Sequence, residues 1–109
     1  MSIGSTIGEC PFTIPDGAVV EGRKHPVGSG VQWRCTFQNG WGASVVRLLI
    51  GPMGGSYGAE DGEWELAVLG KDGRINYDHP VSKGDARGRL VVEMVDRLLA
   101  EIAATREPK

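Results

Sequence analysis

The sequence predicts an α+β fold: an antiparallel β-meander of about four strands with one C-terminal amphipathic helix packed on the sheet. Apolar and polar residues alternate along the middle of the chain, and the last segment changes to helical spacing. A length of 109 residues suits one domain. We expect residues 31–109 to form it. Residues 1–30, rich in Gly, Pro and Ser, are expected to form an irregular arm with at most one edge strand at 18–23.

The first two strands of the meander are predicted to form a hairpin. Alternation over 31–38 places four residues on one face: Val31, Trp33, Cys35 and Phe37. Asn39–Gly40 follows, the dipeptide that most readily supplies the positive φ angles of a tight hairpin. Segment 43–50 is apolar on both faces, so we place it at the centre of the sheet.

Two more strands and a helix complete the predicted fold. We expect strands at 63–70 and at 74–78, the second with Ile75 and Tyr77 facing inward. Segment 90–107 carries the stripe of an amphipathic helix at Val91, Met94, Val95, Leu98, Leu99 and Ile102. The start of this segment, "GRLVVEM", lacks a residue that caps a helix.

The long loop "GPMGGSYGAEDGEW", residues 51–64, is a candidate binding element. It is not a phosphate-binding P-loop, because no Lys follows its glycines and a strand rather than a helix comes next. A connection of this length between strands tends to be functional or disordered, and binding residues favour loops on rigid scaffolds. Its predicted binding residues are Ser56, Tyr57, Glu60 and Asp61.

Arg47 stands within an otherwise apolar strand and therefore needs a partner for its charge. One interpretation is a structural ion pair with Glu65 across the strands. The other is a surface anchor that Arg47 forms with Trp41 and Tyr57, since interfaces favour Arg, Trp and Tyr as hot spots.

Composition argues against several classes of partner and cofactor. A formal net charge of −2 with interspersed signs is a poor profile for a nucleic-acid binder. No run approaches the roughly 20 apolar residues of a membrane span, and the N-terminus does not resemble a signal peptide, so we expect a cytoplasmic protein. The spacing of Cys10, His25, Cys35 and His79 matches no zinc site, so neither a metal nor a cofactor is predicted.

No catalytic constellation emerges from the sequence, so an enzyme is not predicted. Asp78–His79 could act as a base with its orienting carboxylate, but nothing nearby reads as the nucleophile. Cys35 is expected to face the core.

Three stretches, "FQNGWGASVVR", "GGSYGAEDGEWELAVL" and "DGRINYDHPVS", resemble a pattern in small uncharacterised accessory proteins of tailed bacteriophages and prophages. The resemblance spans residues 37–102 and leaves out residues 1–30. It implies no established activity, but it does imply an accessory phage protein in the cytoplasm of a bacterial host.

We therefore expect a non-enzymatic phage accessory protein that binds and modulates or inhibits a host protein, such as a defence component. The alternatives are a module that sequesters a small molecule or nucleotide and a component of the virion or its assembly. Leu49 and Leu69, on the otherwise polar side of the sheet, are compatible with a homodimer.

Overall fold

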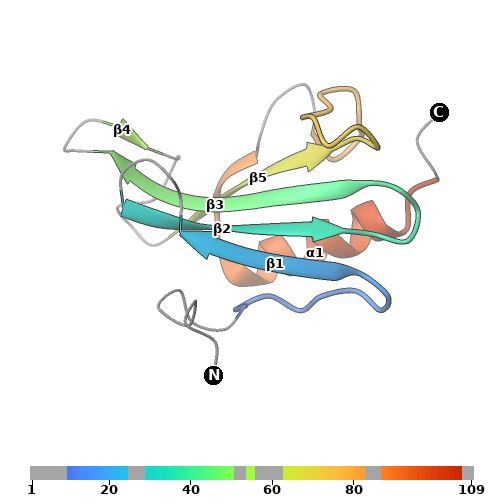
Figure 1. The fold of residues 1–109 in the computed structure, drawn as a ribbon, viewed down its shortest axis with the longest axis horizontal. Helices are drawn as coiled ribbons and strands as arrows, with labels where there is room; N and C mark the ends of the chain where they lie inside the picture. The colour runs from blue at the N-terminus through green and yellow to red at the C-terminus, as the bar shows by residue number, and fades with distance from the viewer. Residues whose placement is uncertain (1–9, 25–28, 51–53, 56–62, 83–86, 107–109) are drawn as a thin grey trace.

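The computed structural model describes residues 10–24, 29–50, 54–55, 63–82 and 87–106, which form one sheet and one helix (Figure 1). The sheet has the order β1-β2-β3-β5-β6, every pair is antiparallel, and β4 pairs with the end of β3. The elements are β1 (Val19–Lys24), β2 (Ser29–Thr36), β3 (Gly42–Ile50), β4 (Gly54–Gly55), β5 (Trp64–Leu69), β6 (Arg87–Leu90) and α1 (Val92–Ala103).

The predicted α+β class is confirmed, with α1 packed on one face of the sheet, but one predicted strand is wrong. Residues 74–78 form turns and a single bridge between Ile75 and Leu69. Ile75 and Tyr77 are 46% and 51% exposed rather than inward. The strand that follows β5 in the sheet is instead β6, a segment for which the sequence pattern predicts no strand.

The β2–β3 hairpin turns through residues 37–41. Phe37 N–H donates to the Trp41 carbonyl and Gly40 N–H donates to the Phe37 carbonyl. Gly40 has φ of 94°, whereas Asn39 does not adopt a positive φ, so the turn is longer than a two-residue hairpin turn. The longer turn projects the Asn39 side chain towards the end of α1.

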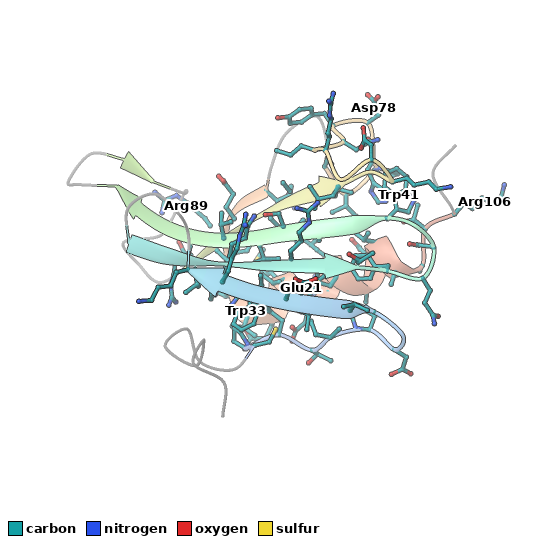
Figure 2. All side chains as sticks on the ribbon, in the orientation of Figure 1. Glu21, Trp33, Trp41, Asp78, Arg89 and Arg106 are labelled. Atoms are coloured by element: carbon teal, nitrogen blue, oxygen red, sulfur yellow. The ribbon has the colours of Figure 1, made fainter. Side chains whose placement is uncertain are left out.

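Asn39 caps the C-terminus of α1 from the hairpin. Its Nδ2 donates to the carbonyls of Ile102, Ala103 and Thr105 at 2.8, 3.1 and 2.8 Å. The last carbonyls of a helix have no partner within the helix, and here a side chain distant in sequence supplies one. The Trp41 indole N–H also donates to the Arg106 carbonyl, and Figure 2 shows these two residues at the same end of the molecule.

The core lies between the sheet and α1. The helix buries Val95, Leu98, Leu99 and Ile102, each worth about 1.5–3 kcal/mol before the entropy of ordering. Val91 occupies the N-cap position just before α1, and its side chain makes no capping hydrogen bond, as the sequence predicts. Facing them are the inward residues of the central strands: Trp33, Cys35, Ala43, Val45, Trp64, Leu66 and Val68.

The edge strand β1 fits closely against β2 because it carries a glycine opposite Trp33. A Cβ on Gly22 would lie 2.3 Å from the indole ring. The register pairs these two residues directly, so the ring occupies the space that a side chain would fill. Only glycine lets the ring lie flat against this strand.

Residues of the predicted arm belong to the same packed body. Phe12 is buried and meets Trp64 edge-to-face, with ring centres 4.9 Å apart. The Thr13 N–H donates to the Asp96 carboxylate of α1 at 2.7 Å. The described part of the arm therefore packs across the helix and leads into β1.

The opposite face of the sheet is polar, with side-chain hydrogen bonds running across the strands. Arg23 Nε donates to Gln32 Oε1, and Gln32 Nε2 donates to Ser44 Oγ, both at 2.8 Å. Leu69 also belongs to this face, yet it is only 6% exposed in the single chain. Its burial therefore requires no second subunit.

We predict that Asn39→Asp destabilises the fold by about 1–3 kcal/mol, because it replaces a donor by an anion at the negative end of the helix dipole. Urea unfolding measures the change. Gln38→Glu is the matched control, an exposed amide-to-acid change one residue away, and we expect it to stay within about 0.5 kcal/mol of the parent. Equal unfolding midpoints for the two variants would show that the cap contributes nothing.

Candidate functional site

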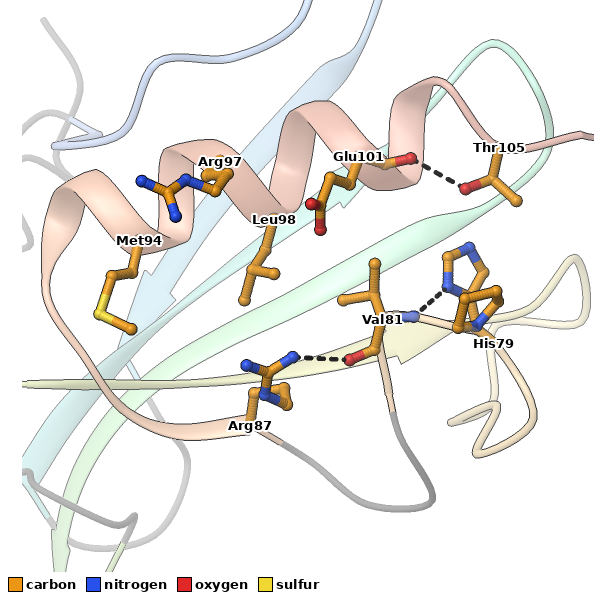
Figure 3. Close-up of a pocket in the computed structure, with 9 residues that line it drawn as sticks. His79, Val81, Arg87, Met94, Arg97, Leu98, Glu101 and Thr105 are labelled. Atoms are coloured by element: carbon orange, nitrogen blue, oxygen red, sulfur yellow. Dashed lines mark hydrogen bonds between the residues drawn. The ribbon is translucent and has the colours of Figure 1, made fainter.

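The candidate site is a pocket of about 440 Å³ between α1 and the segment that leads into β6 (Figure 3). A volume of this size falls in the usual range for small-molecule sites, about 300–1,000 Å³. We call it the helix–loop pocket. Its lining residues are His79, Pro80, Val81, Arg87, Met94, Arg97, Leu98, Glu101 and Thr105.

The helical wall of the pocket is one stripe of α1. Met94, Leu98 and Glu101 follow at spacings of four and three, which places them on one flank of the helix, and Thr105 continues this wall beyond the helix end. The stripe is apolar at its start and polar at its end. Figure 3 shows Met94, Leu98 and Glu101 pointing from the helix towards the opposite wall.

A β-bulge positions Arg87 on that opposite wall. In the β5–β6 pairing, Trp64 faces Leu90 and Leu66 faces Arg87, so β6 contains one residue more than β5 between these points. Arg89 takes up the irregularity with φ of 55°. Bulges of this kind redirect side chains. Arg87 is half-buried on the helix side, where its Nη1 donates to the Val81 carbonyl at 3.2 Å.

A compact turn holds His79 in place. The Asn76 carboxamide oxygen accepts from the backbone N–H groups of Asp78 and His79 at 2.9 and 3.1 Å. Ser82 Oγ donates to the Asn76 carbonyl at 2.7 Å, and Ser82 N–H donates to the His79 carbonyl at 2.9 Å. Asn and Ser side chains commonly organise turns in this way, so the local sequence fixes the histidine backbone.

The hydrogen bonding of His79 determines its tautomer. The Val81 N–H donates to Nδ1 at 3.0 Å, so Nδ1 carries no hydrogen. Burial lowers the pKa of this histidine, and the ring is 2% exposed. The neutral ring therefore carries its hydrogen on Nε2.

That Nε2–H is a buried donor without a hydrogen-bond partner in the described part of the chain. An unpaired buried donor is costly, about 1–3 kcal/mol. Trp41 packs edge-to-face against the same imidazole, with ring centres 4.5 Å apart. The far edge of the ring points towards the last turn of α1, where Glu101 and Thr105 lie (Figure 3).

The electrostatics of the pocket favour an anionic group. Arg87 and Arg97 contribute positive charges and Glu101 a negative one, while His79 is neutral. Within the described residues, neither Arg97 nor Glu101 forms an ion pair, and both are exposed. The arginine charges thus lie beside an apolar wall of Met94 and Leu98.

Other reactive groups in the described part of the chain do not line this pocket. Desolvation by burial, and secondarily the charge of Cys10, raises the pKa of the Cys35 thiol to about 12, so the thiol is protonated at neutral pH. Ser82 Oγ is engaged with the Asn76 carbonyl. Among the described residues, no three His, Cys, Asp or Glu side chains are arranged to hold a metal ion, and His25 lies outside that range.

The structure separates the predicted surface anchors. Trp41 is 9% exposed and supports His79 from the core side, so it is not a surface residue. Arg47 is exposed near the other end of β3, about 20 Å away at the rise of a strand. The remaining predicted binding residues, Ser56, Tyr57, Glu60 and Asp61, lie outside the described residues.

The sheet register does not support the expected ion pair of Arg47 with Glu65. Glu65 pairs with Val46, so its side chain leaves the face of the sheet opposite to that of Arg47. The Arg47 guanidinium carbon instead lies 4.6 Å from the centre of the Trp64 ring, a cation–π contact.

Most of the pocket cannot be predicted from the sequence. The pattern suggests His79 only as a catalytic base or a zinc ligand, and it does not single out Arg87 or Arg97. One signal was available: Arg97 and Glu101 lie four residues apart beside the apolar stripe of the helix, so this flank of α1 combines charge with apolar surface.

Comparisons with family models, curated proteins and solved structures find no match to this chain. The single helix of the described region, α1, has 12 residues, and nothing in that region is both long and apolar enough to serve as a membrane-crossing helix.

We predict that His79 makes the fold less stable in mild acid. The unfolded chain takes up a proton near pH 6.5, whereas native His79, with its lowered pKa, stays neutral. The free energy of unfolding should therefore fall as the pH drops below about 6.5, by up to roughly 1.4 kcal/mol per pH unit, until native His79 itself titrates. Urea unfolding at pH 7.5 and 5.5 measures this loss.

The variant His79→Asn removes the titrating group but keeps an acceptor for the Val81 N–H. Its free energy of unfolding should therefore fall less between pH 7.5 and 5.5 than that of the parent. His25→Asn removes the other histidine of the chain and serves as the control. If His79→Asn lost as much stability as the parent, His79 would not be the group responsible.

Proposed function

We propose that this protein is a non-enzymatic binding protein and that the helix–loop pocket is its binding site. The observation that carries the proposal is the Nε2–H of His79. This donor is buried, since the residue is 2% exposed, and it lacks a hydrogen-bond partner within the described residues. His79 also borders a pocket that two arginines line. Buried polar groups are normally paired, and a bound ligand is one way to pair this one.

The hydrogen bonding favours binding over catalysis. A histidine that acts as a base receives a proton on a free ring nitrogen, and its other nitrogen donates to an orienting carboxylate. In His79 the roles are reversed, because Nδ1 accepts from a backbone N–H and Nε2 carries the hydrogen. Asp78 therefore does not orient the ring through Nδ1, and the ring offers a donor to the pocket.

The resemblance to phage accessory proteins suggests where this binding would take place. The bound molecule, or the host protein that carries the bound group, would be a component of the bacterial cytoplasm. Sequestering such a molecule or blocking such a protein requires a rigid site rather than a reaction, and the capped helix and the hydrogen-bonded turn provide rigid walls.

We predict that Met94→Trp blocks binding without disturbing the core. Met94 is 42% exposed at the pocket wall, so an indole there fills space that a ligand needs. The measurement is a two-dimensional amide NMR spectrum recorded with a fragment library. Hits should move the signals of residues 79, 81, 87 and 94–105 in the parent and lose this effect in Met94→Trp.

Ala100→Trp is the matched control, because Ala100 is exposed on α1 but does not line the pocket. It should bind the same fragments as the parent. Fragment signals that map elsewhere, or that survive unchanged in Met94→Trp, would overturn the proposed site.

A second candidate function is docking on a host protein through Arg47. The exposed guanidinium stacks on the Trp64 ring, and such stacking holds a long side chain in one place before a partner arrives. Arginine and tryptophan are both enriched among the residues that dominate interfaces.

For this candidate we predict that Arg47→Ala lowers recovery of a bacterial protein at least tenfold in a tagged pull-down quantified by mass spectrometry. Arg74→Ala removes another exposed arginine, one in the turn after β5, and should recover the partner like the parent. Equal recovery by both variants, or no near-equimolar protein with the parent, would contradict docking through Arg47.

A further inference from the structure

We infer that the helix–loop pocket takes a small monocarboxylate with an apolar body. This inference rests on the proposed function and names the chemical class of the ligand. Three features of the pocket carry it: its donors, its net charge and its apolar wall.

Both donors come from the wall opposite α1. Arg87 uses one N–H on the Val81 carbonyl, and a guanidinium has further N–H groups in the same plane. His79 adds the N–H that lacks a hydrogen-bond partner. A carboxylate has two oxygens and can accept from both residues at once, with charge-assisted bonds to the guanidinium.

The imidazole must move to make its bond. In the structure Nε2 is closed off from solvent, so the ring shifts towards the cavity when it donates to a ligand oxygen. Satisfying a buried donor favours that shift. The signals of the His79 ring should therefore report the binding of a carboxylate directly.

The charges around the cavity favour a monoanion. Two arginines and one glutamate give a net charge of +1 while His79 is neutral. A single carboxylate balances this charge. A phosphate monoester brings nearly two negative charges to a site that also contains Glu101, and like charges at short range disfavour binding.

The remaining surface suits an apolar body. Leu98 and Val81 are 7% and 6% exposed and form the floor beside the cations, and Met94 lies at the margin. Methionine adapts to ligands of different shape because its side chain is unbranched and flexible. An aromatic or aliphatic chain can therefore cover this wall while its carboxylate meets Arg87.

The experiment titrates the folded chain at pH 7.5 with four probes that share an aromatic body or an anion: phenylacetate, phenylacetamide, phenyl phosphate and inorganic phosphate. NMR follows the amide signals of the pocket and the ring signals of His79. We expect phenylacetate to bind at least tenfold more tightly than each of the other probes.

Two variants test the assigned donors. Arg87→Gln should weaken phenylacetate at least tenfold, and Arg74→Gln, outside the pocket, should not change it. Arg87 also donates to the Val81 carbonyl, so its replacement could disturb the fold as well as binding. Arg97→Gln is therefore a second variant, at an exposed position of the helix. We expect it to weaken phenylacetate binding about threefold or more without altering the fold. Circular dichroism of each variant without ligand verifies the fold.

The outcomes separate this inference from the proposed function. If phenylacetamide bound as tightly as phenylacetate, or if phenyl phosphate bound more tightly than phenylacetate, the assignment of a monocarboxylate ligand would be overturned. The pocket would still stand as a binding site. No pocket signal moving with any of the four probes would also overturn the monocarboxylate. If the wider fragment library then failed at the pocket as well, the proposed function would fall with it.

Discussion

The amide nitrogen of Asn39 joins the β2–β3 hairpin to the end of α1, and the geometry of the site depends on this bond. The carbonyls of Ile102 and Ala103 at the end of the helix and of Thr105 just beyond it share the nitrogen as donor, so the last turn of the helix cannot shift along the sheet without losing these bonds. Trp41, two residues further on, anchors Arg106 and packs against the His79 ring. One turn of the chain thus fixes both the helical wall of the pocket and the histidine opposite it.

The two walls achieve their positions by different means. The helical wall follows from regular geometry, since a stripe of one α-helix places Met94, Leu98 and Glu101 together. The other wall depends on irregular backbone: a bulge in β6 directs Arg87 inward, and an asparagine-centred turn presents His79. Irregular backbone held by side-chain hydrogen bonds is common at functional sites. Here it places two donors beside the cavity, the charged guanidinium of Arg87 and the neutral imidazole of His79, while Arg97 belongs to the helical wall.

Local periodicity was enough to predict the sheet and the helix, but not the pocket. Alternation identified β2 and β5, a segment that is apolar on both faces identified β3, and the helical stripe identified α1 together with its missing cap. Apolar and polar residues alternate along 74–78 as well, yet three hydrogen bonds of Asn76 hold this segment in a turn. The strand at the edge of the sheet next to β5 is therefore β6. The hydrogen-bonded residues that position the walls of the pocket are far apart in the sequence. Asn39 and Thr105, for example, are separated by 66 residues, and no local sequence pattern reveals such a contact.

That separation also orders the assembly of the fold. Thr36 and Gly42 pair across a short turn, whereas the Asn39 cap closes a loop of 66 residues, and the entropy of loop closure must be overcome before such a contact contributes. We therefore expect the hairpin to form early and α1 to dock late. The pocket has one wall from each side of that docking step, so a ligand bound there would act on the departure of the helix. It would slow unfolding and leave the rate of hairpin formation unchanged.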